Sequence, residues 1–280
     1  MQKIAILTDS ASDLSLETLK ENNIHLFPLR ILYSNEEFED KISITPEEVY
    51  NRLSTEIPTT SLPSPKTSAK VLKDLEANGY THVIAISVSS GLSGTFNAFR
   101  LALEEHPNLT SYVYDSKIIG FPQGVLVLEA ARLVKEKKSY DEIIQELPRI
   151  RENITGYFTL DTLEYLKKGG RIGKLAGTIG QFLHLKPIIT MDEHGVYHPY
   201  AKVRGRKQSL SKMIEVLKTH LDESKCKVWI LQGGCMDEAL LFAESVKALH
   251  NCEFMGITPV GAMVAVHSGP GMMGLAIEKV

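Results

Sequence analysis

Residues 83–88 read Val-Ile-Ala-Ile-Ser-Val, and residues 89–95 continue as Ser-Ser-Gly-Leu-Ser-Gly-Thr. The apolar run is typical of a strand buried on both faces, and the segment 96–105 that follows the glycines has a helical pattern. Where a strand ends at a glycine-containing turn and a helix follows, the backbone N–H groups and hydroxyls of the turn are directed at one point. Such a point suits an anionic group, so this stretch predicts a ligand-binding turn in a sheet covered by helices.

The first half of the chain repeats this pattern of an apolar run followed by an amphipathic segment. Residues 4–7 precede a predicted helix from about Ser15, and residues 112–114 precede another predicted helix over 124–137. Alternating strands and helices are typical of the α/β class, so we predict a mostly parallel sheet with helices on both faces. Ligands of such sheets bind at the carboxyl ends of the strands.

The second half of the chain has an α+β pattern. Residues 187–203 read as a hairpin that turns at 192–195, and helices and further strands follow. Before the hairpin, the glycines of 169–173 end one helix, and another is predicted to begin near Leu175. Two domains are therefore expected, with the ligand between them: an N-terminal α/β domain at 1–156 and a C-terminal α+β domain at 157–280.

Polar residues mark several helix starts. A Ser or Thr followed three residues later by Glu predicts a capping box, as in Thr45 with Glu48 and Ser139 with Glu142, and the pair Asp161 and Glu164 looks similar. Ser64-Pro65 also predicts a helix start. The preceding residues 57–63 contain two prolines and are predicted to form an extended loop that holds its hydroxyls away from the regular elements.

Composition and charge exclude several classes of protein. The 280 residues are 43% hydrophobic and carry a formal net charge of −3, so the chain lacks the basic field that nucleic acid or an anionic membrane attracts. The three cysteines, Cys226, Cys235 and Cys252, form no CxxC pair, which argues against a zinc cluster or a disulfide framework. The first apolar run is too short for a signal peptide, so a cytoplasmic location is expected.

Ser93 and His267 are the strongest candidates for chemistry. Ser93 lies in a sequence similar to the G-x-S-x-G nucleophile elbow of hydrolases, but Thr95 stands at the last position, so a hydrogen-bonding or capping serine is the better interpretation. His267 follows the apolar residues 264–266, which read as a strand, and could bind an anion, act as a base or satisfy a carbonyl. The two residues leave a serine-dependent acyl hydrolase as the alternative function.

Other polar residues have two interpretations each. Asp9, Ser10 and Asp13 follow the first strand and could form a wall of the site, but capping and turn formation are favoured. The stretch 169–174 lacks the first glycine and the final Ser or Thr of a Walker A loop, so a nucleotide-binding module is disfavoured. Together with the basic cluster at 202–207 it could form a docking patch, although such clusters are usually solvated surface.

Five motifs, in order along the chain, resemble those of the DegV family, the fatty-acid-binding proteins known in bacteria as FakB. They are Thr8-Asp9-Ser10-Ala11-Ser12-Asp13, Thr60-Ser61-Leu62-Pro63-Ser64-Pro65, Ser89-Ser90-Gly91-Leu92-Ser93-Gly94-Thr95, Leu163-Glu164-Tyr165-Leu166-Lys167-Lys168-Gly169-Gly170-Arg171-Ile172 and His267-Ser268-Gly269-Pro270-Gly271. Because the five occur in register over nearly the whole chain, they are far more specific together than alone.

The resemblance implies a protein that buries a long-chain fatty acid between two domains. It implies that the carboxylate is held by Thr60 and Ser61, by Ser93 with the neighbouring backbone at Gly94, and by His267. In the family, a separate ATP-dependent fatty acid kinase phosphorylates the presented carboxylate to an acyl phosphate for phospholipid synthesis. This chain would then be a lipid carrier and not an enzyme, with no cofactor, metal or ATP site of its own. It departs from many members at Leu62, where they have glutamine.

Elementary energetics agree with such a ligand. Burying about 14 methylenes at ~0.8 kcal/mol each contributes on the order of 11 kcal/mol before the costs of association. The carboxylate must be hydrogen-bonded, because a bare charge removed from water is costly. We expect Arg171 and Arg204 or Arg206 to face the kinase. Transient contact with a membrane or an acyltransferase would fit the same role.

Overall fold

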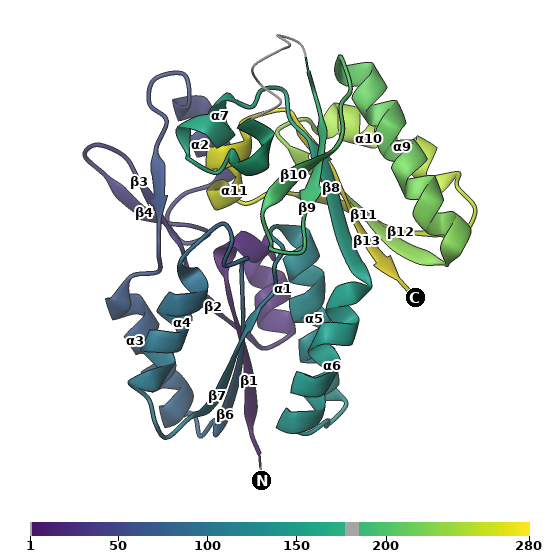
Figure 1. Cartoon of the computed structure of the whole chain (residues 1–280). Coiled ribbons are helices and arrows are strands. Elements are labelled where there is room, and N and C mark those ends of the chain that lie inside the picture. The colour runs from purple at the N-terminus through teal and green to yellow at the C-terminus, as the bar shows by residue number, and fades with distance from the viewer. Residues whose placement is uncertain (1, 177–184) are drawn as a thin grey trace.

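Two stacked units, each built around a β-sheet, make up the computed structural model, which describes residues 2–176 and 185–280 (Figure 1). The lower sheet in that view is parallel, with the strand order β2-β1-β6-β7. Its strands are β1 (Ile4–Asp9), β2 (Ile24–Phe27), β6 (His82–Ser87) and β7 (Thr110–Asp115). The predicted α/β class and the parallel pairing are confirmed.

Helices cover both faces of the parallel sheet, as predicted. They are α1 (Leu16–Glu21), α3 (Pro65–Ala77), α4 (Thr95–Glu104), α5 (Phe121–Lys135) and α6 (Tyr140–Glu152). In β1, Ile4 and Ile6 share a core cluster with α5 and α6, whereas Ala5 and Leu7 share another with α3 and α4. Successive side chains of a strand point to opposite faces, so an uninterrupted apolar strand buries both of its sides.

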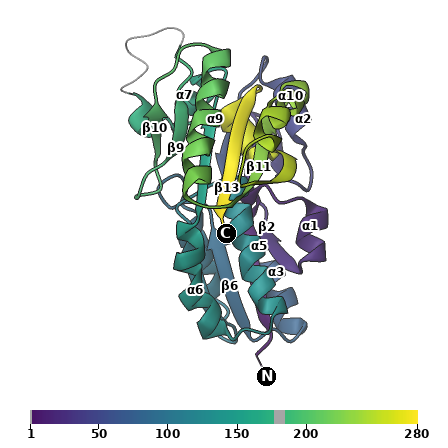
Figure 2. The same cartoon turned by 90° about the vertical axis from the view of Figure 1, so that its right-hand side faces the viewer.

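The second sheet is mixed, with the order β10-β9-β8-β13-β11-β12. Its strands are β8 (Ile154–Thr159), β9 (Ile188–Met191), β10 (Tyr197–Ala201), β11 (Cys226–Gly233), β12 (Cys252–Pro259) and β13 (Met272–Lys279). Strands β9 and β10 form the predicted antiparallel hairpin. Helices α9 (Arg206–Glu223) and α10 (Met236–Lys247) pack on one face, on the outside of the molecule (Figure 2).

Helix α5 joins the two units. It contacts β1 and β6 of the parallel sheet and β8 and β13 of the mixed sheet. Its buried Leu126 belongs to one core cluster with Ile84 of β6 and Ala276 of β13. The two sheets therefore share a core, and the segments that leave them lie close enough to build one site.

A small third sheet completes the fold. It has the order β4-β3-β5, formed by β4 (Glu37–Glu39), β3 (Arg30–Leu32) and β5 (Thr59–Ser61). Helix α2 (Pro46–Arg52) connects β4 to β5 along the chain. Residues Ile31 and Val49 of this part pack with Ala265 of α11 (Ala262–Ser268). A segment of the first half of the chain thus lies against the second unit, and Ile154 already belongs to the mixed sheet. Thr59–Ser61 is a short strand and not the loop expected there.

The prediction of a strand that ends at His267 is wrong. Residues Ala262–Ser268 form helix α11, which begins after Gly261 and carries His267 in its last turn. The side chains of Ala262, Ala265 and Val266 are buried. A helix buried on all sides shows the same unbroken apolar run as a buried strand, so sequence periodicity does not distinguish the two.

Two of the three predicted capping boxes are present. Thr45 with Glu48 caps α2, and Ser139 with Glu142 caps α6. The third is wrong, because α7 (Glu164–Lys168) begins after Leu163 and not after Asp161. The helix predicted from about Leu175 falls mainly on 177–184, outside the described residues. None of the helices within the described ranges is long and apolar enough to cross a membrane.

Candidate ligand-binding site between the two sheets

The site begins where the loops after β1 and β6 separate. Strand β2 lies on one side of β1 and β6 on the other, so the chain leaves β1 and β6 in opposite directions, and a crevice opens at their carboxyl ends. The buried Asp9 carboxylate ties the two loops together, because Oδ1 accepts from the N–H of Ala11 at 3.0 Å and Oδ2 from that of Val88 at 2.7 Å. Burial raises the pKa of Asp9 to about 6. Asp9 therefore caps the following turn and also fixes the start of the serine loop, residues 89–95.

The serines of the serine loop have different tasks. Ser89 donates from Oγ to the carbonyl of Gly195 at 2.7 Å, and Ser90 donates to Asp115 Oδ2 at 2.6 Å. Ser93 Oγ lies 2.7 Å from Thr95 Oγ1 at the start of α4. Ser89 and Ser90 thus anchor the loop, and Ser93 is the serine that reaches the lining of a cavity.

His267 lies between the third sheet and this cavity. Its Nε2 is 2.9 Å from Thr60 Oγ1, and its buried Nδ1 has no hydrogen-bond partner among the described residues. Burial, and secondarily the positive charge of Arg171, lowers the pKa of His267 to about 4. The imidazole is therefore neutral at pH 7, and a bound anion must obtain its counter-charge from another group.

Arg171 supplies a positive charge at the same place. It follows α7, and its Nη1 donates to the carbonyl of Gly169 at 2.6 Å, while its Nε donates to that of Leu92 at 3.4 Å. Its side chain lines a small cavity together with Ser93 and His267. The sequence predicted a surface role for Arg171, but the structure places it in the wall of this cavity, where an arginine suits a carboxylate.

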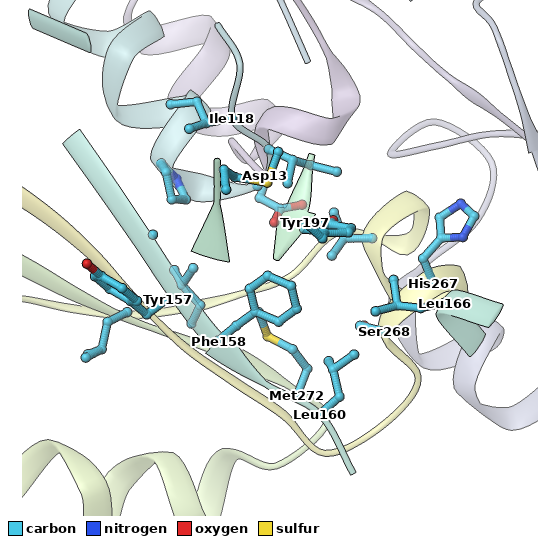
Figure 3. A pocket seen from close by; sticks show the side chains of 18 residues that line it. Asp13, Ile118, Tyr157, Phe158, Leu160, Leu166, Tyr197, His267, Ser268 and Met272 are labelled. Atoms are coloured by element: carbon cyan, nitrogen blue, oxygen red, sulfur yellow. The ribbon is translucent and has the colours of Figure 1, made fainter. Parts of the chain in front are cut away.

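A larger, mostly apolar cavity adjoins the small one (Figure 3). The two cavities share Ile119, Tyr197 and His267 in their walls. The apolar lining of the larger cavity comes from both units and includes Ile118, Phe158, Leu160, Leu166, Met191 and Met272. A small cavity with a positively charged side chain in its wall, beside a larger apolar cavity, suits an amphipathic ligand that carries an anionic head.

The remaining predicted site residues lie apart from the small cavity. Ser61 accepts from Arg30 Nη2 at 3.2 Å, on the opposite side of β5 from Thr60, as the alternation of a strand requires. Gly94 lies in the turn before α4 and does not line either cavity.

The two predicted docking arginines differ in their surroundings. Arg206 is partly buried and ion-paired with Glu238, with Asp161 Oδ1 3.7 Å from its Nη1. Arg204 is exposed, at the edge of a shallow depression. Neither lines the two adjoining cavities. Among the described residues, no group of three or more His, Cys, Asp or Glu side chains could hold a metal ion.

Tyr197 is a lining residue that the sequence did not single out, because it follows the hairpin turn and gave no motif signal. Asp13 also lines the larger cavity, which is the wall position that the sequence analysis offered as the less favoured of two interpretations. The only available signal for Asp13 was its place just after the first strand.

Comparison with known proteins first assigns the architecture. A fatty-acid-binding DegV family protein from Thermus thermophilus shares it with a TM-score of 0.92 and 30% identity, covering 100% of both chains. DegV of Bacillus subtilis, a fatty-acid-binding protein, gives a TM-score of 0.91 at 30% identity with the same coverage. The chain thus has the fold of a class of α/β proteins that includes these two lipid binders.

The sequence comparisons then give the family. A DegV domain-containing protein of Clostridium perfringens is 52% identical over 279 residues, which cover 100% of this chain and 99% of the relative. The family described as "Uncharacterised protein, DegV family" matches residues 3–280. The chain belongs to the DegV family, and the resemblance found in its motifs is confirmed.

Replacing Gly91 by alanine tests how the serine loop is held. A Cβ on Gly91 would lie 2.6 Å from the carbonyl oxygen of Gly195 and 2.7 Å from that of His194, so the hairpin tip must move. We expect Gly91→Ala to lower the free energy of unfolding by about 1–3 kcal/mol in chemical denaturation. Gly94→Ala is the matched control, because its Cβ would meet only Leu62 methyl carbons, the nearer at 3.7 Å, so it should cost less than about 1 kcal/mol. If both variants lost the same free energy of unfolding, the contact between Gly91 and the hairpin tip would not be what holds the serine loop.

Proposed function

We propose that this protein binds a long-chain fatty acid, with the acyl chain in the larger cavity and the carboxylate in the small one. The observation that carries the proposal is the convergence of Ser93, Arg171 and His267 on a small cavity that shares wall residues with a larger, apolar one. Fatty acid binding by the DegV proteins of Thermus thermophilus and Bacillus subtilis supports it.

The charges at the small cavity define how the head group is held. A carboxylate buried without donors loses its hydration at a large cost, so the guanidinium of Arg171 is the group expected to balance its charge. The hydroxyls of Thr60 and Ser93 add donors from two other segments, and the neutral imidazole of His267 is held by its contact with Thr60. The acyl chain supplies the affinity and this polar end fixes the orientation.

We further propose that the carboxylate is presented to a separate ATP-dependent fatty acid kinase in the cytoplasm. The protein would then be a carrier that passes its ligand on as an acyl phosphate. Arg204, which is exposed, suits a docking role better than Arg206, which is only partly exposed. The exposed Lys202 and Lys207 lie beside Arg204 in the sequence and extend the basic surface.

The alternative of an acyl hydrolase finds less support in the geometry. Ser93 Oγ is hydrogen-bonded with Thr95, and His267 Nε2 with Thr60, so the two proposed catalytic side chains are not bonded to each other. A nucleophilic serine needs a base within hydrogen-bond reach, and that base needs an orienting group.

One experiment separates the carrier from the hydrolase. The purified protein is treated with a covalent serine probe and with a long-chain ester, and its lipid is extracted under denaturing conditions for mass spectrometry. A carrier releases an intact fatty acid and shows neither labelling of Ser93 nor ester turnover. Labelling together with turnover would establish the hydrolase and refute the carrier, and extraction without any fatty acid would refute the proposed ligand.

Thr60 and Ser61 give a matched pair of variants for the head-group site. Thr60→Val keeps the shape of the side chain but removes the hydroxyl next to His267, whereas Ser61→Ala removes a hydroxyl that accepts from Arg30. Loss of one hydrogen bond to a charged group predicts a roughly tenfold weaker affinity for octadecanoic acid in Thr60→Val. Ser61→Ala should bind like the wild type in isothermal titration calorimetry. The reverse order of the two affinities would place the carboxylate on the other side of β5.

The pKa of His267 reports directly on the bound head group. In the free protein, burial and the charge of Arg171 hold this pKa at about 4. A carboxylate in the small cavity favours the charged imidazolium, so binding should raise the pKa, and by linkage the protein should take up protons on binding at pH values between the two pKa values. The measurement is an NMR titration of isotopically labelled histidine with and without octadecanoic acid. An unchanged midpoint would show that the carboxylate does not approach His267.

A further inference from the structure

Asp13 places a carboxyl group in the wall of the apolar cavity. It follows the short 3₁₀ helix at Ser10–Ser12 and has the left-handed φ of 56°, which a short polar side chain tolerates better than most. Figure 3 shows Asp13 among the lining side chains, and its charge, after burial, contributes to the raised pKa of Tyr197. The surrounding walls are largely apolar, so Asp13 is chemically distinct from its neighbours.

The two oxygens of Asp13 are used differently. Oδ1 accepts from the N–H of Gly261 at 2.7 Å, which holds the residue before α11. Oδ2 has no hydrogen bond and no ion pair within 4.0 Å among the described residues, although Lys41 lies near enough to act on the charge. Beside it, Gly120 leaves space, since a Cβ there would lie 3.3 Å from Oδ2. One oxygen is therefore structural, and the other remains an acceptor without a donor.

An unsubstituted acyl chain would meet this oxygen unfavourably. Methylene groups packed against Oδ2 exclude water and offer no donor, and a buried acceptor left without a partner costs free energy. The same desolvation raises the pKa of Asp13 to about 7. A hydroxyl on the acyl carbon that lies beside Asp13 would instead donate to Oδ2, and both polar groups would then have a hydrogen-bond partner.

We propose that the larger cavity is built for a hydroxylated acyl chain, whose hydroxyl donates a hydrogen bond to Asp13 Oδ2. The inference rests on the proposed function and names its ligand more closely: a long-chain fatty acid with a hydroxyl group along the chain. Beside apolar side chains such as Phe158 or Met272, which form most of the lining, the hydroxyl would remain without a partner.

The test measures the affinity of the lipid-free wild-type protein for octadecanoic acid and for a positional series of hydroxyoctadecanoic acids. The measurements are made at a pH of about 8.5, where a carboxyl with a pKa of about 7 is ionised. We expect one isomer to bind at least as tightly as the parent acid. The other isomers should bind roughly tenfold more weakly, because their hydroxyl is buried unpaired. The oxo acid with its ketone at the favoured carbon should also bind weakly, since a ketone has no donor.

Asp13→Asn is the diagnostic variant. Its amide oxygen can still accept from the N–H of Gly261, and asparagine also tolerates a left-handed φ, so the turn should be retained. The amide NH₂ replaces Oδ2 with a donor, so the variant should gain affinity for the oxo acid relative to the wild type. Thermal unfolding shows whether the variant is folded.

The outcomes separate this inference from the proposed function. If octadecanoic acid binds to the wild type but every hydroxy isomer is weakened alike, the role of Asp13 is refuted, and fatty acid binding stands. The same result would follow if Tyr197 turned its hydroxyl to Asp13 and satisfied it within the protein. If octadecanoic acid itself fails to bind, the proposed function is refuted. Because the isomer series is read in the wild type, the inference remains testable even if Asp13→Asn does not fold.

Discussion

The buried carboxylate of Asp9 is the interaction on which the geometry of the site depends. It bonds to backbone N–H groups of Ala11 and Val88, so a single side chain fixes both loops that leave the parallel sheet. Its raised pKa shows that ionising it there is costly, but without it two backbone donors would be buried with no acceptor. The direction of the serine loop, and therefore the position of Ser93, follows from this junction.

Much of the fold and part of the site were predictable because they depend on local sequence. The run 83–88 is apolar except for Ser87 because its strand is covered by helices on both faces, and the glycines at 91 and 94 follow its end. The hairpin at 192–195 and the capping boxes at Thr45 and Ser139 are equally local. The meeting of Ser93, Thr60 and His267 followed from the family resemblance, since their separation along the chain carries no information about contact.

The features that escaped prediction are those set by tertiary packing. Helix α11 is enclosed by the third sheet and α7, so its sequence lacks the polar face that would distinguish it from a strand. Arg171 looks like an exposed cation in sequence, but the glycines before it let the chain turn back, and its guanidinium meets the carbonyls of Gly169 and Leu92. Which of two adjacent hydroxyls reaches His267 was likewise decided by the pairing of β5 with β3.

The site exists only when both units are packed together, and this links ligand binding to stability. Ser93 comes from the parallel-sheet unit, Thr60 from the third sheet, and Arg171 and His267 from the second half of the chain. The apolar cavity is lined in the same way, by Ile118 from one unit and Phe158 from the other. A ligand that touches all of these segments binds the folded chain and not the unfolded one, so its binding free energy adds to the stability of the packed units. The cost of burying Asp13 and His267 and of partly burying Arg171 at this junction is therefore lowest when the cavity is filled by a ligand that pairs with them.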